Sequence, residues 1–83
     1  ADSVWRFSRE SFLTPGKTMA VDLKFSADGY AYEQNTVLSY EYRVSGDIFR
    51  IDRQTFRILQ ASADSISLIS EKNRTPAALI RLR

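Results

Sequence analysis

The stretch LSYEYRVSGDIFRID, residues 38–52, places a large apolar or aromatic side chain at almost every second position on both sides of a Ser-Gly pair. Because successive side chains of a β-strand point to opposite faces, this period predicts two half-buried strands joined by a turn. One face of the first strand carries Leu38, Tyr40, Tyr42 and Val44. The opposite face carries Ser39, Glu41 and Arg43.

A second alternating stretch, AVDLKFS, is followed by Asp28-Gly29, which is a strong signal for a hairpin with a two-residue type I′ turn. Such a turn would set Phe25 opposite Tyr32 and Lys24 opposite Glu33. An apolar pair would then lie on one face and a charge pair on the other.

A further turn is expected near Arg53-Gln54. It would pair Ile51 with Phe56 and Phe49 with Ile58, and would place Arg50 directly opposite Arg57. Like charges in directly opposed positions are unfavourable unless an acidic side chain lies between them.

Similar short stretches begin and end the chain, with turn signals about every ten residues. The sequence therefore predicts one all-β domain over residues 1–83, an antiparallel up-and-down meander of about eight short strands. Rolling into a closed or partly closed barrel would protect the sheet edges. Side chains should fill most of the interior. The predicted core contains Trp5, Phe25, Tyr42, Phe49, Phe56 and Leu68.

The chain has no histidine and no cysteine, which excludes Ser-His-Asp and Cys-His nucleophilic sites and the usual zinc ligand sets. The three glycines fall at turn positions and form no phosphate-binding loop. Most acidic residues stand beside Lys or Arg and are expected to be solvated partners. We therefore expect a non-enzymatic protein with no catalytic residues, no metal site and no cofactor.

Arginine outnumbers lysine nine to three. Arg43, Arg50 and Arg57 fall on the polar face of three consecutive predicted strands and are the candidate partner-binding residues, since a guanidinium binds carboxylates and phosphates bidentately. The alternative is a soluble mixed-charge face, in which Glu41, Asp47 and Asp52 neutralise the arginines diagonally.

Tyrosine supplies a second candidate. Tyr30, Tyr32 and Tyr40 lie in neighbouring strands and would stack a planar ligand or a base if they open at a barrel mouth. The alternative is packing, because Tyr32, Tyr40 and Tyr42 are expected on the inner face, where their hydroxyl groups need partners.

An early Trp5, the LKFSADG strand and turn, YRVSGDIFRI, FRILQASADSISLI and a short final strand together resemble small bacterial lipocalin-like, or calycin-like, domains. The resemblance covers most of the chain. It implies a β-barrel and export from the cytoplasm, but not a particular ligand. We therefore expect a secreted or periplasmic protein, with a cytoplasmic location as the alternative; the first residue, Ala1, fits either a processed end or an arbitrary boundary.

These features predict that the protein is a small binding or structural module that acts through protein-protein contact on its arginine-bearing face. The alternative is a lipocalin-like carrier of a small hydrophobic ligand. A nucleic-acid-binding barrel ranks third, because a net charge of +2 is small for that role. No apolar run approaches the ~18 residues of a membrane span.

Overall fold

The structure is a computed structural model that describes residues 3–10 and 16–82; Ala1 and Pro15 lie outside the described residues. Over these ranges it contains strands and turns but no helix, which confirms the predicted all-β class. The strands are β1 (Val4–Glu10), β2 (Thr18–Phe25), β3 (Tyr30–Glu33), β4 (Ser39–Ser45), β5 (Ile48–Ile51), β6 (Gln54–Ala61), β7 (Ser65–Ser70) and β8 (Pro76–Arg81).

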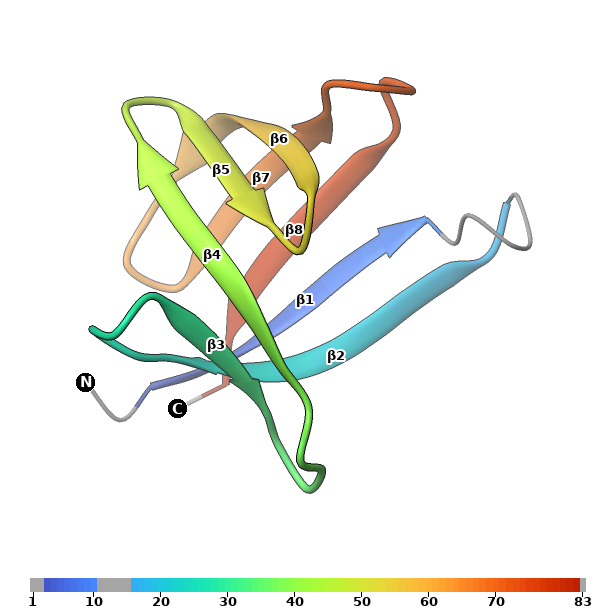
Figure 1. The fold of residues 1–83 in the computed structure, drawn as a ribbon. Coiled ribbons are helices and arrows are strands. Elements are labelled where there is room, and N and C mark those ends of the chain that lie inside the picture. The colour runs from blue at the N-terminus through green and yellow to red at the C-terminus, as the bar shows by residue number, and fades with distance from the viewer. Residues whose placement is uncertain (1–2, 11–15, 83) are drawn as a thin grey trace.

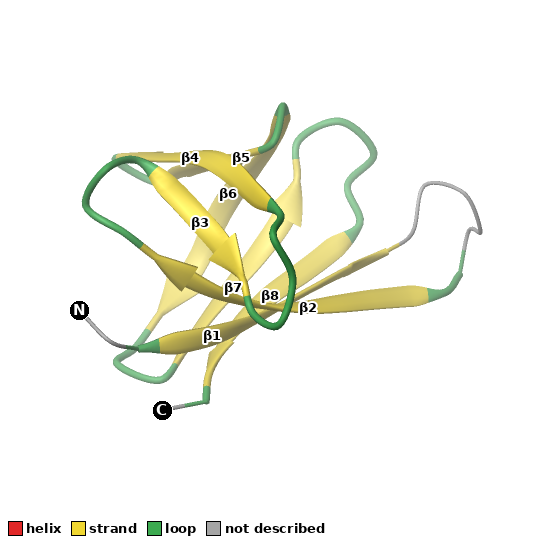
Figure 2. Ribbon diagram, turned by 60° about the horizontal axis from the view of Figure 1, so that its bottom comes forward, coloured by secondary structure: helices red, strands yellow, loops and turns green. Residues whose placement is uncertain are grey.

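Each strand pairs antiparallel with the next along the chain, and β1 also pairs with β8, so that the sheet closes into a barrel (Figures 1 and 2). The closing pair runs from Trp5 opposite Arg81 to Arg9 opposite Ala77. This is the predicted up-and-down meander in its fully closed form. Closure satisfies the backbone groups of both terminal strands, which an open sheet would expose to a foreign strand.

None of the described segments forms a helix with the length and apolar character needed to cross a membrane.

The centre of the barrel is filled by side chains. Leu23 and Leu68 are the largest fully buried residues, with relative exposures of 0% and 1%. Phe7 makes edge-on ring contacts with Phe56 at 5.5 Å and with Phe49 at 6.1 Å, an arrangement that aromatic rings favour. The predicted core is confirmed: Phe49, Phe56 and Leu68 are buried, and Trp5, Phe25 and Tyr42 pack against them.

The predicted register of the β2–β3 hairpin is wrong by one residue. Phe25 lies opposite Ala31, and Lys24 lies opposite Tyr32. The connection has three residues between Ser26 and Tyr30 rather than two, because Gly29 adopts a φ of +91° as the extra residue after the turn. A turn followed by a glycine in the left-handed conformation is the usual connection of three-residue hairpins. The added residue moves each side chain of β3 to the face opposite the one predicted.

The predicted register of β5–β6 is also wrong, by two residues. Phe49 lies opposite Phe56, and Ile51 lies opposite Gln54. The two central residues of the turn are Asp52 and Arg53, both with positive φ (47° and 70°), as a type I′ turn requires. Since a shift of two residues keeps every side chain on its face, the predicted inner and outer faces of β5 and β6 remain correct.

Candidate functional site

Arg43 and Arg50 face each other across the outer surface of β4 and β5. The register therefore corrects the prediction that Arg50 faces Arg57; its partner on β6 is Thr55. Within the described part of the chain, neither guanidinium takes part in a hydrogen bond or ion pair. The predicted diagonal neutralisation by Glu41 and Asp52 is thus not formed at these two arginines.

Both arginines line an open groove of about 520 Å³ on the outside of the barrel, which we call the arginine groove. It lies over β3, β4 and β5 and the turns at Gly29 and Asp52. Its walls are formed by Asp28, Gly29, Tyr30, Glu41, Tyr42, Arg43, Arg50, Ile51, Asp52 and Arg53. The groove therefore combines three guanidinium groups with three carboxylates and an exposed tyrosine.

Arg57, the third candidate, is engaged elsewhere. Its Nη1 lies 2.8 Å from Asp47 Oδ2, and its Nε lies 2.9 Å from Glu71 Oε1. The contact with Asp47 is the diagonal neutralisation that the sequence predicted. Arg57 is absent from the walls of the arginine groove, so the structure brings together two of the three candidate arginines and holds the third in an ion-pair network.

The three candidate tyrosines are divided between the outer face and the interior of the barrel. Tyr30 lines the arginine groove and lies opposite Glu41. Tyr32 also lies on the outer face, with a relative exposure of 41%, which corrects its predicted inner position; the one-residue register shift placed the small Ala31 inside instead. Only Tyr40 points into the barrel.

The outward Tyr32 stabilises the β2–β3 turn. Its hydroxyl group donates a 2.6 Å hydrogen bond to Asp28 Oδ2, and Asp28 Oδ1 accepts one from the Tyr30 backbone N–H at 3.0 Å. The bond from Tyr32 is the main cause that lowers the pKa of Asp28 below its ordinary value, and the same bond raises the pKa of Tyr32. Tyr32 is therefore committed to the turn rather than presented for stacking.

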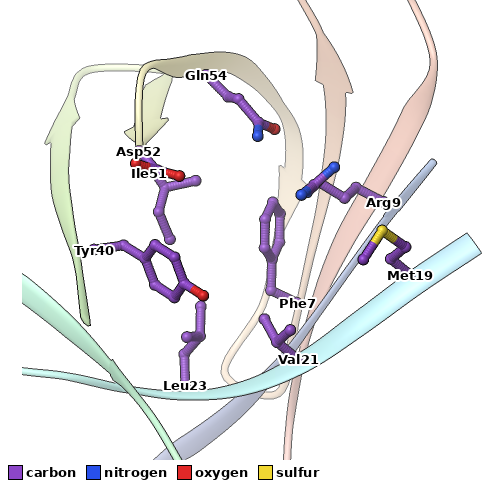
Figure 3. Close-up of a pocket in the computed structure, with 9 residues that line it drawn as sticks. All are labelled: Phe7, Arg9, Met19, Val21, Leu23, Tyr40, Ile51, Asp52 and Gln54. Carbon is purple, nitrogen blue, oxygen red and sulfur yellow. The ribbon is translucent and has the colours of Figure 1, made fainter. Parts of the chain in front are cut away.

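Tyr40 lines a small cavity of about 60 Å³ at one end of the barrel, which we call the polar cavity (Figure 3). Its ring lies across the cavity from the ring of Phe7, and Arg9 and Met19 approach from β1 and β2. The Tyr40 hydroxyl donates a 2.7 Å hydrogen bond to Glu33 Oε1. That bond chiefly raises the pKa of Tyr40, the negative charge of Asp52 adds to the effect, and the positive charge of Arg9 opposes it.

Gln54 closes the polar cavity from the β5–β6 side, with its carboxamide turned inward (Figure 3). Its Oε1 is buried and has no hydrogen-bond partner among the described residues. A buried polar atom without a hydrogen-bond partner is rare in native proteins and calls for an explanation. Sequence reasoning missed Gln54 and Arg9 as site residues, although strand alternation already places Arg9 on the same face as Trp5 and Phe7.

A second cavity, of about 160 Å³, lies at the opposite end of the barrel, and we call it the apolar cavity. The Tyr42 hydroxyl at its wall donates to the Ser26 carbonyl oxygen at 2.6 Å and is thus satisfied by the protein itself. The lining side chains come from Trp5, Phe25, Tyr42, Val44, Phe49, Ile58, Ile66, Leu68 and Leu79.

No family model, no curated protein and no solved structure matches this chain. The described residues include no cluster of three or more acidic side chains that could hold a metal ion. The candidate sites are therefore the arginine groove on the outer face, the polar cavity and the apolar cavity, each defined by its own geometry.

Proposed function

We propose that this protein is a small non-enzymatic binding module whose contact surface is the arginine groove, and that its partner is an acidic segment of another protein. The observation that carries the proposal is the pair of facing guanidinium groups, Arg43 and Arg50, which no described carboxylate neutralises. A pair of cations left unbonded inside a groove supplies donors that an incoming carboxylate can satisfy.

The composition of the groove favours a protein partner over a nucleic acid. Glu41, Asp28 and Asp52 lie among the arginines and would repel the phosphates of a continuous backbone. Tyr30 adds an exposed aromatic ring, a residue type that is enriched where proteins meet. A complementary partner would carry carboxylates spaced to reach Arg43 and Arg50, together with basic groups that pair with Glu41.

The test is a titration of ¹⁵N-labelled protein with a glutamate-rich peptide that also carries lysine, followed by amide chemical shifts. We expect shifts confined to β4, β5 and the Gly29 turn, and loss of those shifts in the Arg43→Gln/Arg50→Gln double variant. Arg6→Gln is the matched control, because Arg6 is an exposed arginine already bonded to Asp22 at 2.9 Å. Equal binding by the double variant and the control would contradict the proposal, and a stronger response to duplex DNA than to the peptide would favour the nucleic-acid alternative.

A second candidate function is favoured by the apolar cavity: carriage of a small hydrophobic ligand, as in lipocalin-like proteins. Cavities of about 150 Å³ lined by apolar side chains stay dry and bind molecules of the size of benzene. The volume of about 160 Å³ is in that range.

Trp5, the only tryptophan of the chain, lines the apolar cavity and reports on its occupation. Titration with benzene or toluene should change the Trp5 fluorescence saturably, and Ile66→Phe, which fills the cavity, should abolish that change. Leu59→Phe is the matched control, because Leu59 is a neighbouring aliphatic residue outside the cavity with a relative exposure of 61%. An unsaturable response, or a saturable one that survives Ile66→Phe, would rule out the carrier function at this site.

A further inference from the structure

The first half of β2 carries an inference that does not rest on the arginine groove. β2 runs from Thr18 to Phe25, but β3 pairs only with its last three residues, from Leu23 onward. Figure 1 shows β2 continuing well past β3. We propose that the uncovered edge of residues 18–21, which we call the β2 edge, pairs with the same edge of a second copy of this chain to form a twofold symmetric dimer.

The backbone groups of Thr18 and Ala20 point to the β2 edge. Alternate residues of a paired strand direct their N–H and C=O groups to the same side. The Asp22 carbonyl oxygen accepts a 2.9 Å hydrogen bond from the Gln34 N–H on the side of β3, so Ala20 and Thr18 face that side too. β3 does not extend to them, and among the described residues neither has a backbone hydrogen bond there. Two donors and two acceptors are therefore open to another strand.

The β2 edge has none of the features that protect free edges, as far as the described residues show. Natural proteins protect such edges with charged side chains, proline or a β-bulge. Residues 18–21 are Thr, Met, Ala and Val, and their register with β1 is regular. Thr18, Met19 and Ala20 are all exposed, so an incoming strand can reach the backbone.

The positions of the open groups select one register for a second copy. An antiparallel pair centred on Met19 sets Thr18 of each copy opposite Ala20 of the other. Residues in such hydrogen-bonded pairs exchange both bonds, so all the open groups of both copies are used. A pair centred on Thr18 or on Ala20 would instead set one of them opposite Gly16 or Asp22. The Gly16 N–H already donates to Glu10 Oε1 at 3.1 Å, and the Asp22 carbonyl oxygen already accepts from Gln34.

The side chains fit the same register. Met19, with a relative exposure of 45%, would lie directly opposite Met19 of the second copy, in a non-hydrogen-bonded pair where side chains approach closely. The flexible thioether adapts to such a contact. Thr18 and Ala20 would meet on the other face, where both are small and uncharged. A foreign strand would satisfy the open groups of one molecule, whereas self-pairing satisfies those of both copies.

The experiment follows the amide signals of the ¹⁵N-labelled full chain as its concentration is raised. An interface of one short strand pair is small, so we expect a dissociation constant on the order of 0.1–1 mM, within a series from about 0.02 to about 2 mM. The concentration-dependent shifts should be confined to residues 17–21, with slower tumbling of the whole molecule.

A mixture of ¹³C-labelled and unlabelled protein tests the register. The Cα atoms of a non-hydrogen-bonded antiparallel pair lie only about 4.5 Å apart. We therefore expect an isotope-filtered NOE between the Hα atoms of Met19 in the two copies.

Two variants test the assigned contacts. Ala20→Pro removes the N–H that points to the β2 edge and no hydrogen bond to β1, because proline is tolerated on the free side of an edge strand. Met19→Lys sets like charges opposite each other at an exposed position, so it should fold but not dimerise. Both should abolish the concentration-dependent shifts. Leu59→Lys is the matched control, since it adds the same charge at an apolar residue of β6 that is 61% exposed, and it should dimerise normally.

Three results would overturn the proposal. The first is a chain that stays monomeric up to about 2 mM, which would leave the β2 edge to a strand of a different protein. The second is self-association whose shifts lie elsewhere, for example at the exposed Val37 and Leu38. The third is normal association of Ala20→Pro or Met19→Lys when the amide spectrum outside β2 shows that the variant is folded.

Discussion

Arg43 on β4 and Arg50 on β5 are directly opposed, and within the described residues no acidic side chain is bonded to either guanidinium. Opposed like charges destabilise a strand pair. We therefore predict that Arg50→Gln leaves the free energy of unfolding unchanged or raises it by a few tenths of a kcal/mol. Urea denaturation at low ionic strength measures this. A loss above about 0.5 kcal/mol would show that Arg50 makes stabilising contacts.

Arg57→Gln is the matched change at an arginine that is paired. It removes two ion-pair contacts, one of 2.8 Å to Asp47 and one of 2.9 Å to Glu71. Since these pairs are exposed, the expected loss is only about 0.2–1 kcal/mol, and it should shrink as salt is added. Arg57→Gln should therefore lower the free energy of unfolding, whereas Arg50→Gln should not, although the chemical change is the same.

Phe49→Ala should cost about 3–5 kcal/mol of unfolding free energy, the usual penalty for removing a buried phenylalanine. Phe49 has a relative exposure of 3% and contacts the rings of Phe7, Phe25 and Phe56. The control is Leu59→Ala at the β-bulge of β6, where the side chain is 61% exposed and the expected loss is below about 1 kcal/mol. Equal losses at the two positions would contradict the described core.

Arg53→Gly should stabilise the protein. Arg53 has a φ of +70° in the type I′ turn. This left-handed conformation costs a residue with a side chain about 1–2 kcal/mol, and glycine avoids that cost. Glycine in turn loses more conformational entropy on folding, which offsets the gain by about 0.5–1 kcal/mol. We expect a net gain of about 0.5–1 kcal/mol in thermal or urea unfolding.

Gly46→Ala is the opposite experiment, because Gly46 has a φ of +60° and its replacement introduces the strain that Arg53→Gly removes. Stability should fall in that variant. If Arg53→Gly also lowered stability, the Arg53 side chain would have to make contacts that outweigh the backbone strain.

Stability should fall at high pH through Tyr40. Its hydrogen bond to Glu33, together with the nearby charge of Asp52, raises the pKa of Tyr40 in the folded state. Between the ordinary tyrosine pKa, about 10, and the raised value, the folded protein binds more protons than the unfolded chain. The stabilising contribution is therefore present below pH ~10 and is lost as the pH rises through the folded value.

Tyr40→Phe lacks the titrating group, so its stability should depend less on pH in this window than that of the unaltered protein. The comparison needs urea unfolding curves at several alkaline pH values. Tyr30→Phe is the control, because the Tyr30 hydroxyl makes no hydrogen bond in the described structure. Parallel pH profiles for the unaltered protein and Tyr40→Phe would contradict the assignment.

The fold class, and for most strands the face on which each side chain lies, could be predicted from the sequence alone. Two-residue alternation assigns each side chain to one of two faces whatever strand lies alongside, so Phe49, Phe56 and Leu68 were correctly placed in the core. The same alternation put Arg43, Arg50 and Arg57 on the outside. The eight-strand meander followed from the regular spacing of turn signals.

The residues that lie opposite one another on neighbouring strands could not be predicted in the same way. Register depends on turn length and backbone conformation, and the same Asp-Gly pair is compatible with a two-residue turn or with the three-residue connection seen before Tyr30. One extra residue moved Tyr32 to the outer face and Ala31 into the core. The pairing of Arg57 with Glu71 and the closure of β1 onto β8 join positions far apart in the sequence, and no local pattern encodes those distances.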